Sequence, residues 1–334
     1  MTRLYTMRQE PVLKTTVWGG RKLETMFNTP LPEGEKVGES WLLADHPHGT
    51  SRVANGPLAG APLRQVVDEH GGDLFGGPVP PAWRERFPLL VKIIDAMDDL
   101  SVQVHPGPAY IQRHGIQDRA KAECWVILHA DPGSRLITGL RPGTNARAFR
   151  RAAERGMLDD MLVVQEVGPG DALLIPAGRL HAIGAGIVLA EFQQPSDTTY
   201  RVYDWGRTDA RGRSRQLHLD RAMDCIDFSG GFPEAGGRGL VDQGGGTLLE
   251  SLVECDAFGV HRATVTAGVM ERRLDHGFEC VMITDGQGEV VSSLDDRPVR
   301  VVKGQAVVVP ASAGAYELRS AVTMTALLGT VPKA

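Results

Sequence analysis

The sequence predicts a mainly β protein built from two jelly-roll β-barrel domains with a small helical insertion. Three observations lead to this prediction: an excess of turn-forming residues, apolar runs of strand length, and a repeated block of sequence. The 334 residues include 40 glycines and 21 prolines, which is above average usage but below the level of low-complexity chains. Many tight turns between short strands explain this excess, whereas a helical bundle does not.

The apolar runs are spread along the chain and are separated by turn clusters. Residues 1–85 mix short apolar pieces with turns, and one short helix is expected at 63–70. Residues 144–162 have a helical pattern with Thr144 or Asn145 as N-cap, and they form the predicted insertion. Compact or alternating apolar runs predict buried strands over 88–94, 100–105, 122–128, 172–175 and 187–193, and a further strand that begins at 163.

A repeated block relates the middle of the chain to its end. Residues 170–177 (GDALLIPA) match residues 304–311 (GQAVVVPA), and residues 123–127 (ECWVI) match residues 279–283 (ECVMI). The interval between the two blocks is longer in the first copy, and the helical insertion accounts for most of the difference. Two β-domains related by duplication are therefore expected, and antiparallel jelly rolls suit the pattern of strands and turns.

The overall composition excludes several classes of protein. A formal net charge of −5 and a pI of about 6.1 give no electrostatic footprint for nucleic acid or an anionic membrane. No apolar run approaches a membrane span, and the N-terminus lacks an apolar core of signal-peptide length. The four cysteines form no C-x-x-C pair, so neither a disulfide framework nor a Cys-type zinc site is expected. We expect a cytoplasmic protein with a small-molecule partner, without nucleic acid or membrane, and of open oligomeric state.

A candidate metal site lies on the predicted strands of the first domain. Gln103 and His105 stand two residues apart in a strand, so both side chains project from one face. Glu123 interrupts an apolar strand, and His181 follows a strand that ends in a Pro-Gly turn. Two imidazoles, a carboxylate and an amide oxygen, with one position left for water or substrate, suit a divalent cation such as zinc. The alternative is that the histidines are satisfied core residues and that Glu123 pairs with Lys121.

The second copy of the repeat lacks most of this site. Its alignment with the first copy puts Ala315 opposite His181 and Glu279 opposite Glu123, with no Q-x-H upstream. The second domain is therefore predicted to hold no metal. The expected organisation is an N-terminal part over 1–228 with a catalytic core at about 87–207, a Gly-rich linker over 229–246, and a metal-free domain over 247–334.

A polar segment at 191–207 follows a strand close to His181. Hydroxyl groups together with arginines suit a polyol phosphate, because a guanidinium binds oxyanions through a bidentate fork. The alternative is a solvated loop with ordinary surface ion pairs. The residues that carry the prediction are Ser196, Asp197, Thr198, Thr199, Arg201 and Arg207.

These residues carry a resemblance to a known family. Over nearly its whole length the chain resembles the short bacterial form of the type I phosphomannose isomerases, and the motifs S-x-Q-V-H-P and S-D-T-T-Y-R-V-Y-D are the most specific. The matching segments are 11–14 with 18–20, 38–41, 87–96, 100–106, 121–123, 175–178 with His181, and 191–207.

The resemblance implies a cupin-type fold and interconversion of mannose 6-phosphate and fructose 6-phosphate, with Arg201 as the catalytic arginine. It also implies one zinc ion per chain, bound by Gln103, His105, Glu123 and His181. These ligands agree with those chosen from strand parity, whereas the sugar is named by the resemblance alone.

The other residues near the site are assigned as candidates. Lys121 and Asp197 are candidates for proton handling or substrate positioning. The candidate substrate-binding residues are Ser101, Glu191, Ser196 and Arg207.

The sequence departs from the family pattern in two places. Residues 120–123 read A-K-A-E where G-K-T-E is expected. His46 and His48 form an H-x-H unit outside the family site, and the proline between them favours a loop over a second metal site.

Other functions stay open at this point. A non-catalytic cupin that binds sugar phosphates, a cupin isomerase for a different sugar, and a cupin oxygenase with a ferrous site are the alternatives. The absence of an H-x-H pair at the site argues against the oxygenase, because Gln103 stands where its first histidine is expected.

Overall fold

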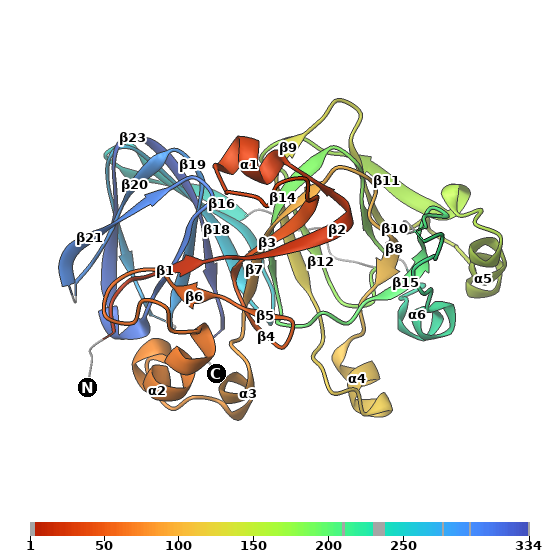
Figure 1. Cartoon of the computed structure of the whole chain (residues 1–334), viewed down its shortest axis with the longest axis horizontal. Helices are drawn as coiled ribbons and strands as arrows, with labels where there is room; N and C mark the ends of the chain where they lie inside the picture. Colours follow the sequence, from red (N-terminus) through yellow and green to blue (C-terminus); the bar gives the residue numbers. More distant parts are fainter. Residues whose placement is uncertain (1–3, 209–210, 230–237, 276, 294, 333–334) are drawn as a thin grey trace.

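Two β-rich halves lie side by side in the computed structural model of the chain (Figure 1). The structure describes residues 4–208, 211–229, 238–275, 277–293 and 295–332. Every pairing between its named strands is antiparallel. The mainly β prediction is confirmed. Within the described ranges, no helix has the length and apolar character needed to cross a membrane.

The first half is built on a six-stranded sheet in the order β12-β9-β14-β7-β2-β3. Two of its strands coincide with the predicted segments 172–175 and 187–193. The sheet consists of β12 (Ala172–Ile175), β9 (Glu123–Ala130), β14 (Ile187–Gln193), β7 (Leu90–Ala96), β2 (Val12–Gly20) and β3 (Val37–Leu43).

Smaller sheets complete this half. One has the order β11-β10-β13, and two are pairs of strands, β15 with β8 and β4 with β5. Their bounds are β11 (Leu162–Glu166), β10 (Arg135–Leu140), β13 (Ala182–Ile183), β15 (Tyr200–Tyr203), β8 (Val102–Val104), β4 (Asp45–His46) and β5 (Gly49–Thr50).

The helical insertion is present but shorter than predicted. Helix α5 (Ala146–Glu154) begins after Asn145, whose side chain accepts hydrogen bonds from the backbone N–H groups of Arg147 and Ala148. Gly156 has a positive φ of 67°, and the chain continues through the short 3-10 helix η1 (Asp159–Met161) into β11. The helical pattern therefore ends at a left-handed glycine, and the apolar residues beyond it belong to a strand.

The remaining helices are short. Helix α2 extends five residues beyond the predicted segment 63–70, and the others escaped prediction because so few turns show no clear periodicity. They are α1 (Lys22–Phe27), α2 (Leu63–Phe75), α3 (Pro81–Glu85), α4 (Pro108–His114), α6 (Leu219–Cys225) and the 3-10 helix η2 (Ala311–Ala313).

The second half is a ten-stranded sheet that includes strands from the N-terminus. Strand β1 pairs with β22 in a register that sets Met7 opposite Val308, and β6 pairs with β1. The sheet contains β16 (Arg238–Gly244), β17 (Thr247–Glu254), β18 (Gly259–Arg273), β19 (Glu279–Asp285), β20 (Gln287–Ser292), β21 (Asp295–Val302), β22 (Ala306–Val309), β23 (Ala315–Thr330), β1 (Met7–Glu10) and β6 (Arg52–Val53).

The N-terminal segment is thus divided between the halves, whereas the sequence placed it on the first half alone. Strands β2 and β3 join the first half, and β1 crosses to the second (Figure 1). Met7 is completely buried there. The physical reason is that β22 would otherwise present an unpaired edge of backbone N–H and C=O groups, which β1 covers.

The predicted linker over 229–246 contains a β-strand. Residues 230–237 lie outside the described residues. Residues 238–244 form β16, which pairs with β17, and Gly245 and Gly246 have positive φ values of 60° and 80°. Two such residues in a row give the hairpin turn its twist, so the glycine cluster here shapes a turn between strands.

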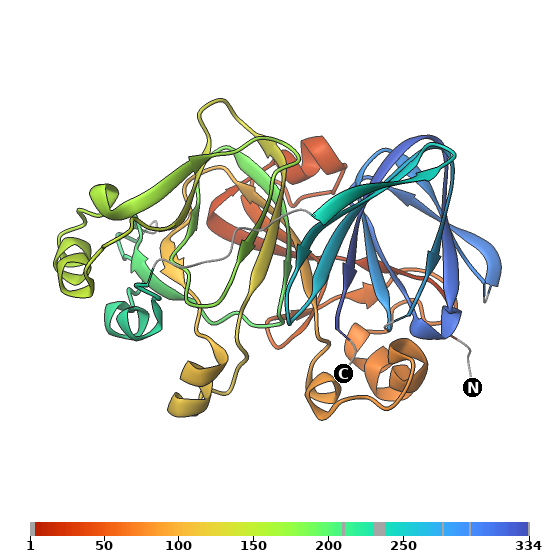
Figure 2. The same cartoon turned by 180° about the vertical axis from the view of Figure 1, so that it is seen from behind.

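A shared hydrophobic core joins the two halves, which Figure 2 shows from the opposite side. Cys124 and Phe192 of the first half belong to one buried cluster with Phe258, Phe278 and Leu327 of the second. Cys124 therefore points away from its neighbour Glu123, as strand alternation predicts. One face of β9 packs toward the second half, and the other face carries Glu123 at its start, followed by Trp125 and Ile127 of a second buried cluster within the first half.

The repeated blocks occupy equivalent places in the two sheets. Glu123 on β9 lies opposite Ile175 on β12, and Glu279 on β19 lies opposite Val309 on β22. In both copies the glutamate begins its strand and faces the residue before a Pro-Ala pair. The register thus matches the alignment made from sequence.

The second-copy glutamate is neutralised by side chains of its own half. Arg272 donates to both carboxylate oxygens of Glu279, with Nη2–Oε1 at 2.7 Å and Nε–Oε2 at 3.3 Å, and the Tyr316 hydroxyl also donates to Oε2. Glu279 and Tyr316 are buried. Burial, followed by the nearby carboxylate, raises the pKa of Tyr316 well above its usual value, so the phenol stays a donor.

Replacing Arg272 by methionine is expected to lower the free energy of unfolding by about 3 kcal/mol, because a buried carboxylate loses its counter-charge. Chemical denaturation measures this loss. Arg319, which is 47% exposed and pairs with Glu317, provides the control, and Arg319→Met should change stability little. The double variant Arg272→Met/Glu279→Met should recover most of the loss. Equal stability of Arg272→Met and the parent chain would contradict the role of this pair.

Candidate metal centre and active site

Four polar side chains from three separate parts of the sequence meet in the first half. Gln103 lies on β8, His105 directly follows that strand, and Glu123 begins β9. Gln103 and His181 form an isolated antiparallel bridge, in which each backbone N–H donates to the other residue's carbonyl, at 3.0 and 2.9 Å. Main-chain pairing therefore sets the distance between β8 and the turn that carries His181.

Both histidines direct Nε2 toward Glu123. His105 Nε2 lies 3.2 Å from Glu123 Oε1, and His181 Nε2 lies 3.7 Å from Oε2. All three side chains are about 1% exposed. The ligating atoms lie within 4.8 Å of one another. Strand parity therefore predicted a real cluster.

Each imidazole is held by its second nitrogen. His105 Nδ1 lies 2.9 Å from the carbonyl oxygen of Thr198, and His181 Nδ1 lies 2.8 Å from that of Arg179. Because a carbonyl only accepts, Nδ1 carries the proton in both rings. The lone pair of Nε2 thus faces the cluster, as in metal-binding histidines.

Burial keeps the two histidines neutral. It lowers the pKa of His105, and it lowers the pKa of His181 to about 3, with His105 as the next contribution. Burial opposes ionisation of Glu123 as well, but Lys121 and the two histidines hold the pKa of this carboxyl well below its usual value. The cluster therefore offers two neutral imidazoles and one carboxylate at neutral pH.

One oxygen of Glu123 has no hydrogen-bond partner. Its Oε2 is buried, and the 3.7 Å contact with His181 is too long for a hydrogen bond. Lys121 Nζ satisfies the other oxygen at 2.7 Å, so the pairing raised as an alternative from the sequence exists beside the cluster. An orphaned carboxylate oxygen among two imidazole lone pairs is the donor set that a divalent cation such as zinc requires.

Gln103 approaches the cluster through its side-chain amide. Its Nε2 lies 3.2 Å from His181 Nε2, and its Oε1 accepts a hydrogen bond from the Ser101 hydroxyl at 3.0 Å. Rotating the terminal amide by half a turn exchanges the two atoms, and a hydroxyl can serve as donor or acceptor. Gln103 can therefore present its oxygen to a cation without losing Ser101.

The cluster opens into a cavity of about 370 Å³. His105 is buried beside it and does not line it. Of the residues predicted from sequence for metal, catalysis or substrate, the lining includes Ser101, Gln103, Lys121, Glu123, His181, Glu191, Asp197 and Arg201.

Arg201 brings a guanidinium close to the candidate metal ligands. On β15 it lies directly opposite Gln103 on β8. Its Nε is buried without a hydrogen-bond partner. Burial lowers the pKa of Arg201, and the positive charge of Arg215 lowers it further. This guanidinium has donors to spare for an anionic group in the cavity.

Comparison with known proteins places the chain in a family. Residues 6–113 match the family model for the catalytic domain of type I phosphomannose isomerase. A mannose-6-phosphate isomerase of Bacillus subtilis is 36% identical over 311 residues, which cover 92% of this chain and 94% of the relative. The chain belongs to the type I phosphomannose isomerase family. The resemblance predicted from its motifs is confirmed, and so is the prediction of an isomerase.

Other phosphomannose isomerases support this assignment. The mannose-6-phosphate isomerase of Streptococcus mutans is 37% identical over 294 residues, covering 88% of this chain and 89% of that one. The crystal structure of mannose-6-phosphate isomerase from Bacillus subtilis has a TM-score of 0.89 and 29% identity, covering 98% of this chain and 99% of that one. A mannose 6-phosphate isomerase crystallised with zinc and yttrium shares the fold, with a TM-score of 0.75 at 15% identity and coverage of 98% and 100%.

Two of the predicted substrate-binding residues have contacts outside the cavity. The Ser196 side chain is completely buried and donates to Asp118 at 2.9 Å. Arg207 donates to Asp204 at 2.5 Å and to the backbone carbonyl of Asp99. Neither residue lines the cavity in this phosphomannose isomerase, because acidic and carbonyl groups hold both.

Asp118 is a site residue that the sequence analysis missed. Its carboxylate accepts hydrogen bonds from Ser196, Thr198 and Arg86, at 2.9, 2.6 and 2.7 Å. Burial opposes its ionisation, but these hydrogen bonds lower the pKa of Asp118 to about 2. Asp118 thus fixes the loop whose Thr198 carbonyl orients His105. A lone acid in a loop gave no sequence signal for this role.

Two basic residues in the cavity wall were also missed. Lys92 on β7 is buried and pairs with Glu191 at 2.9 Å and Glu39 at 3.5 Å. Burial disfavours its charge, yet these carboxylates raise the pKa of Lys92. Arg215 lines the cavity with Arg201, and Asp204 accepts from it at 2.8 Å. The lone lysine in the apolar run 88–94 was an available signal, whereas Arg215 lies in an irregular arginine-rich loop.

Proposed function

We propose that this phosphomannose isomerase interconverts mannose 6-phosphate and fructose 6-phosphate through an enediol, with one zinc ion held by Gln103, His105, Glu123 and His181. The observation that carries the proposal is the orphaned Oε2 of Glu123 facing two neutral imidazoles. When bound, zinc supplies Lewis acidity toward the sugar oxygens. The relatives named mannose-6-phosphate isomerase support this choice of sugar.

Isomerisation moves a proton between neighbouring sugar carbons, and the cavity offers groups for that task. Burial raises the pKa of Asp197, but Lys92 and Lys121 overcome this and lower it. Asp197 is therefore a carboxylate at neutral pH and can accept a proton. Lys121, whose ammonium lies 2.7 Å from Glu123, can donate one. We assign these two residues to proton handling during ring opening and enediol formation.

The two arginines supply charge for the anionic parts of the reaction. Arg201, with its unpartnered Nε, faces the space beside Gln103 and can stabilise the negative charge that develops on the enediol. Arg215 adds a second guanidinium to the same wall, oriented by Asp204. Arg215 is the proposed phosphate partner, and Ser101 is a neutral donor to the substrate. Glu191 contributes indirectly, because its carboxylate holds Lys92 in the cavity wall.

Removal of metal tests the proposal. Dialysis against a chelator should abolish isomerase activity, and added zinc should restore it in proportion to the zinc bound. The reason is that the proposed reaction needs a cation to polarise the sugar oxygens. A coupled assay with mannose 6-phosphate, glucose 6-phosphate and mannose measures turnover, and metal analysis measures zinc.

The outcomes separate the alternatives. Full activity in a preparation shown to be zinc-free would contradict the proposed mechanism. Turnover of glucose 6-phosphate or of mannose, without turnover of mannose 6-phosphate, would favour an isomerase for a different sugar. Turnover of none of the three by the zinc-loaded chain would favour a sugar-phosphate-binding protein.

A further inference from the structure

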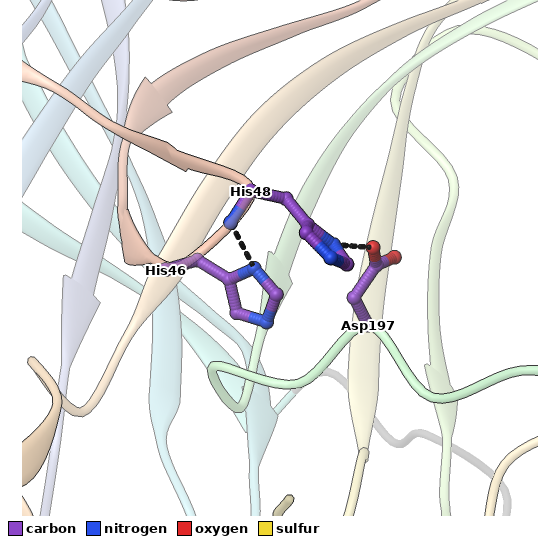
Figure 3. Close-up of side chains that lie close together, drawn as sticks. All are labelled: His46, His48 and Asp197. Carbon is purple, nitrogen blue, oxygen red and sulfur yellow. Dashed lines mark hydrogen bonds and ion pairs between the residues drawn. The ribbon is translucent and has the colours of Figure 1, made fainter.

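We propose that His46, His48 and Asp197 form a second divalent-cation site beside the substrate cavity, with zinc as the preferred ion. His46 ends β4, His48 lies in the turn between β4 and β5, and Asp197 comes from the loop before β15 (Figure 3). One ligating atom from each residue lies within 4.8 Å of the others. The sequence predicted a loop here, which is correct, but it gave no sign of the third side chain.

The cluster differs from an ordinary surface ion pair. His48 Nδ1 lies 2.8 Å from Asp197 Oδ2, and the two side chains are 66% and 40% exposed. A similar pair, His129 with Asp131 at 2.7 Å, also lies on the surface. His46 adds a third donor to the first pair only. Within the described residues, this cluster and the proposed zinc centre are the groups of three ligating side chains that could hold a metal ion.

His46 gives the cluster a fixed, neutral donor. It is buried, its ring stacks edge-on against Trp41, and its Nδ1 accepts the backbone N–H of His48 at 3.2 Å. Burial lowers the pKa of His46 to about 4, and the charge of Arg86 contributes. The ring is therefore uncharged at neutral pH, the form that binds metal. Binding of a cation exchanges the His46–His48 hydrogen bond for coordination.

Two imidazoles and one carboxylate with an open side to solvent match the ligand set of zinc sites that keep a coordinated water. Lys92 and Lys121 lower the pKa of Asp197 despite its burial, so its carboxylate is ionised. Exposure of His48 and Asp197 lets an ion reach the site directly from solvent. We therefore expect reversible binding that is weaker than binding at the buried centre.

A cation at this site would compete with the substrate for Asp197, which also lines the cavity. This consequence rests on the proposed function, whereas binding itself does not. The first equivalent of zinc should activate the enzyme, and excess zinc should inhibit it. Loss of the second site should remove the inhibition without removing the activation.

Zinc stoichiometry tests the second site directly. The metal-free full chain is dialysed against a fixed excess of zinc, and bound metal is measured by elemental analysis. We expect two ions in the parent chain, one in His48→Ala, and two in the matched control His129→Ala. Circular dichroism and the melting temperature show whether each variant is folded, and His48→Leu provides a second test in which the new side chain has no ligating atom.

Variants at the buried centre separate this proposal from the proposed function. His181→Ala should keep one ion, and His48→Ala/His181→Ala should keep none. A single ion in the parent chain, or two in both folded His48 variants, would overturn the second site. If His181→Ala keeps both ions, the proposed catalytic zinc fails, while the His48 result still decides the second site.

Discussion

Replacement of Arg201 by alanine is expected to reduce kcat/KM for mannose 6-phosphate by about 10²–10³-fold, the effect of removing one preorganised donor to a developing negative charge. Zinc content should stay unchanged, because Arg201 lies opposite Gln103 on the neighbouring strand without being one of the proposed ligands. The coupled assay and metal analysis on one preparation measure both quantities.

Two further variants show whether the loss of activity is specific to the Arg201 guanidinium. Arg201→Lys keeps the charge but loses the planar fork, so it should recover only part of the activity. Arg300 is 88% exposed in the second half, and Arg300→Ala should leave kcat/KM unchanged. Activity of Arg201→Ala close to that of the parent chain would remove Arg201 from the mechanism, and loss of zinc would reassign it to the metal centre.

Replacement of His181 by alanine should abolish both zinc binding at the buried centre and isomerase activity. His181 Nε2 is one of two neutral imidazole nitrogens facing Glu123, and its loss leaves a carboxylate with a single imidazole. The measurement is best made in the His48→Ala background, where only the buried centre is expected to bind zinc. Elemental analysis and the coupled assay then report on the same site.

His129→Ala provides the matched histidine control, since this partly exposed side chain pairs with Asp131 and is not part of the cavity lining. It should keep zinc and activity in the same background. One equivalent of zinc in the folded His181→Ala/His48→Ala chain would rule out His181 as a ligand.

The grouping of residues at the candidate metal centre could be predicted in large part because strands alternate their faces. Gln103 and His105 had to share a face, and Cys124 had to point away from Glu123, which its burial in the shared core agrees with. His181 could be placed because it follows a strand and a turn. Strand identity and side-chain direction are local properties, and local sequence determines them.

Contacts between distant loops could not be predicted in this way. Asp118 and Arg215 lie in irregular segments, where no period relates a residue to its neighbours in space. Ser196 and Arg207 have the right chemistry for a sugar phosphate, but Asp118 and Asp204 bind them. Such competition between partners appears only once the chain is folded. The pairing of β1 with β22 of the second half could not be predicted for the same reason, since an edge strand can pair with a segment from anywhere in the chain.

The two copies of the repeat differ in how the carboxylate oxygens of the equivalent residues Glu279 and Glu123 are paired. In the second copy, Arg272 and Tyr316 satisfy both carboxylate oxygens of Glu279. In the first copy, Lys121 pairs with one oxygen of Glu123, and Oε2 has no hydrogen-bond partner, which the proposed zinc ion would provide. On the proposed function, removal of zinc should therefore disturb the site around Glu123 and leave the site around Glu279 unchanged, because the partners of Glu279 are all side chains of the protein.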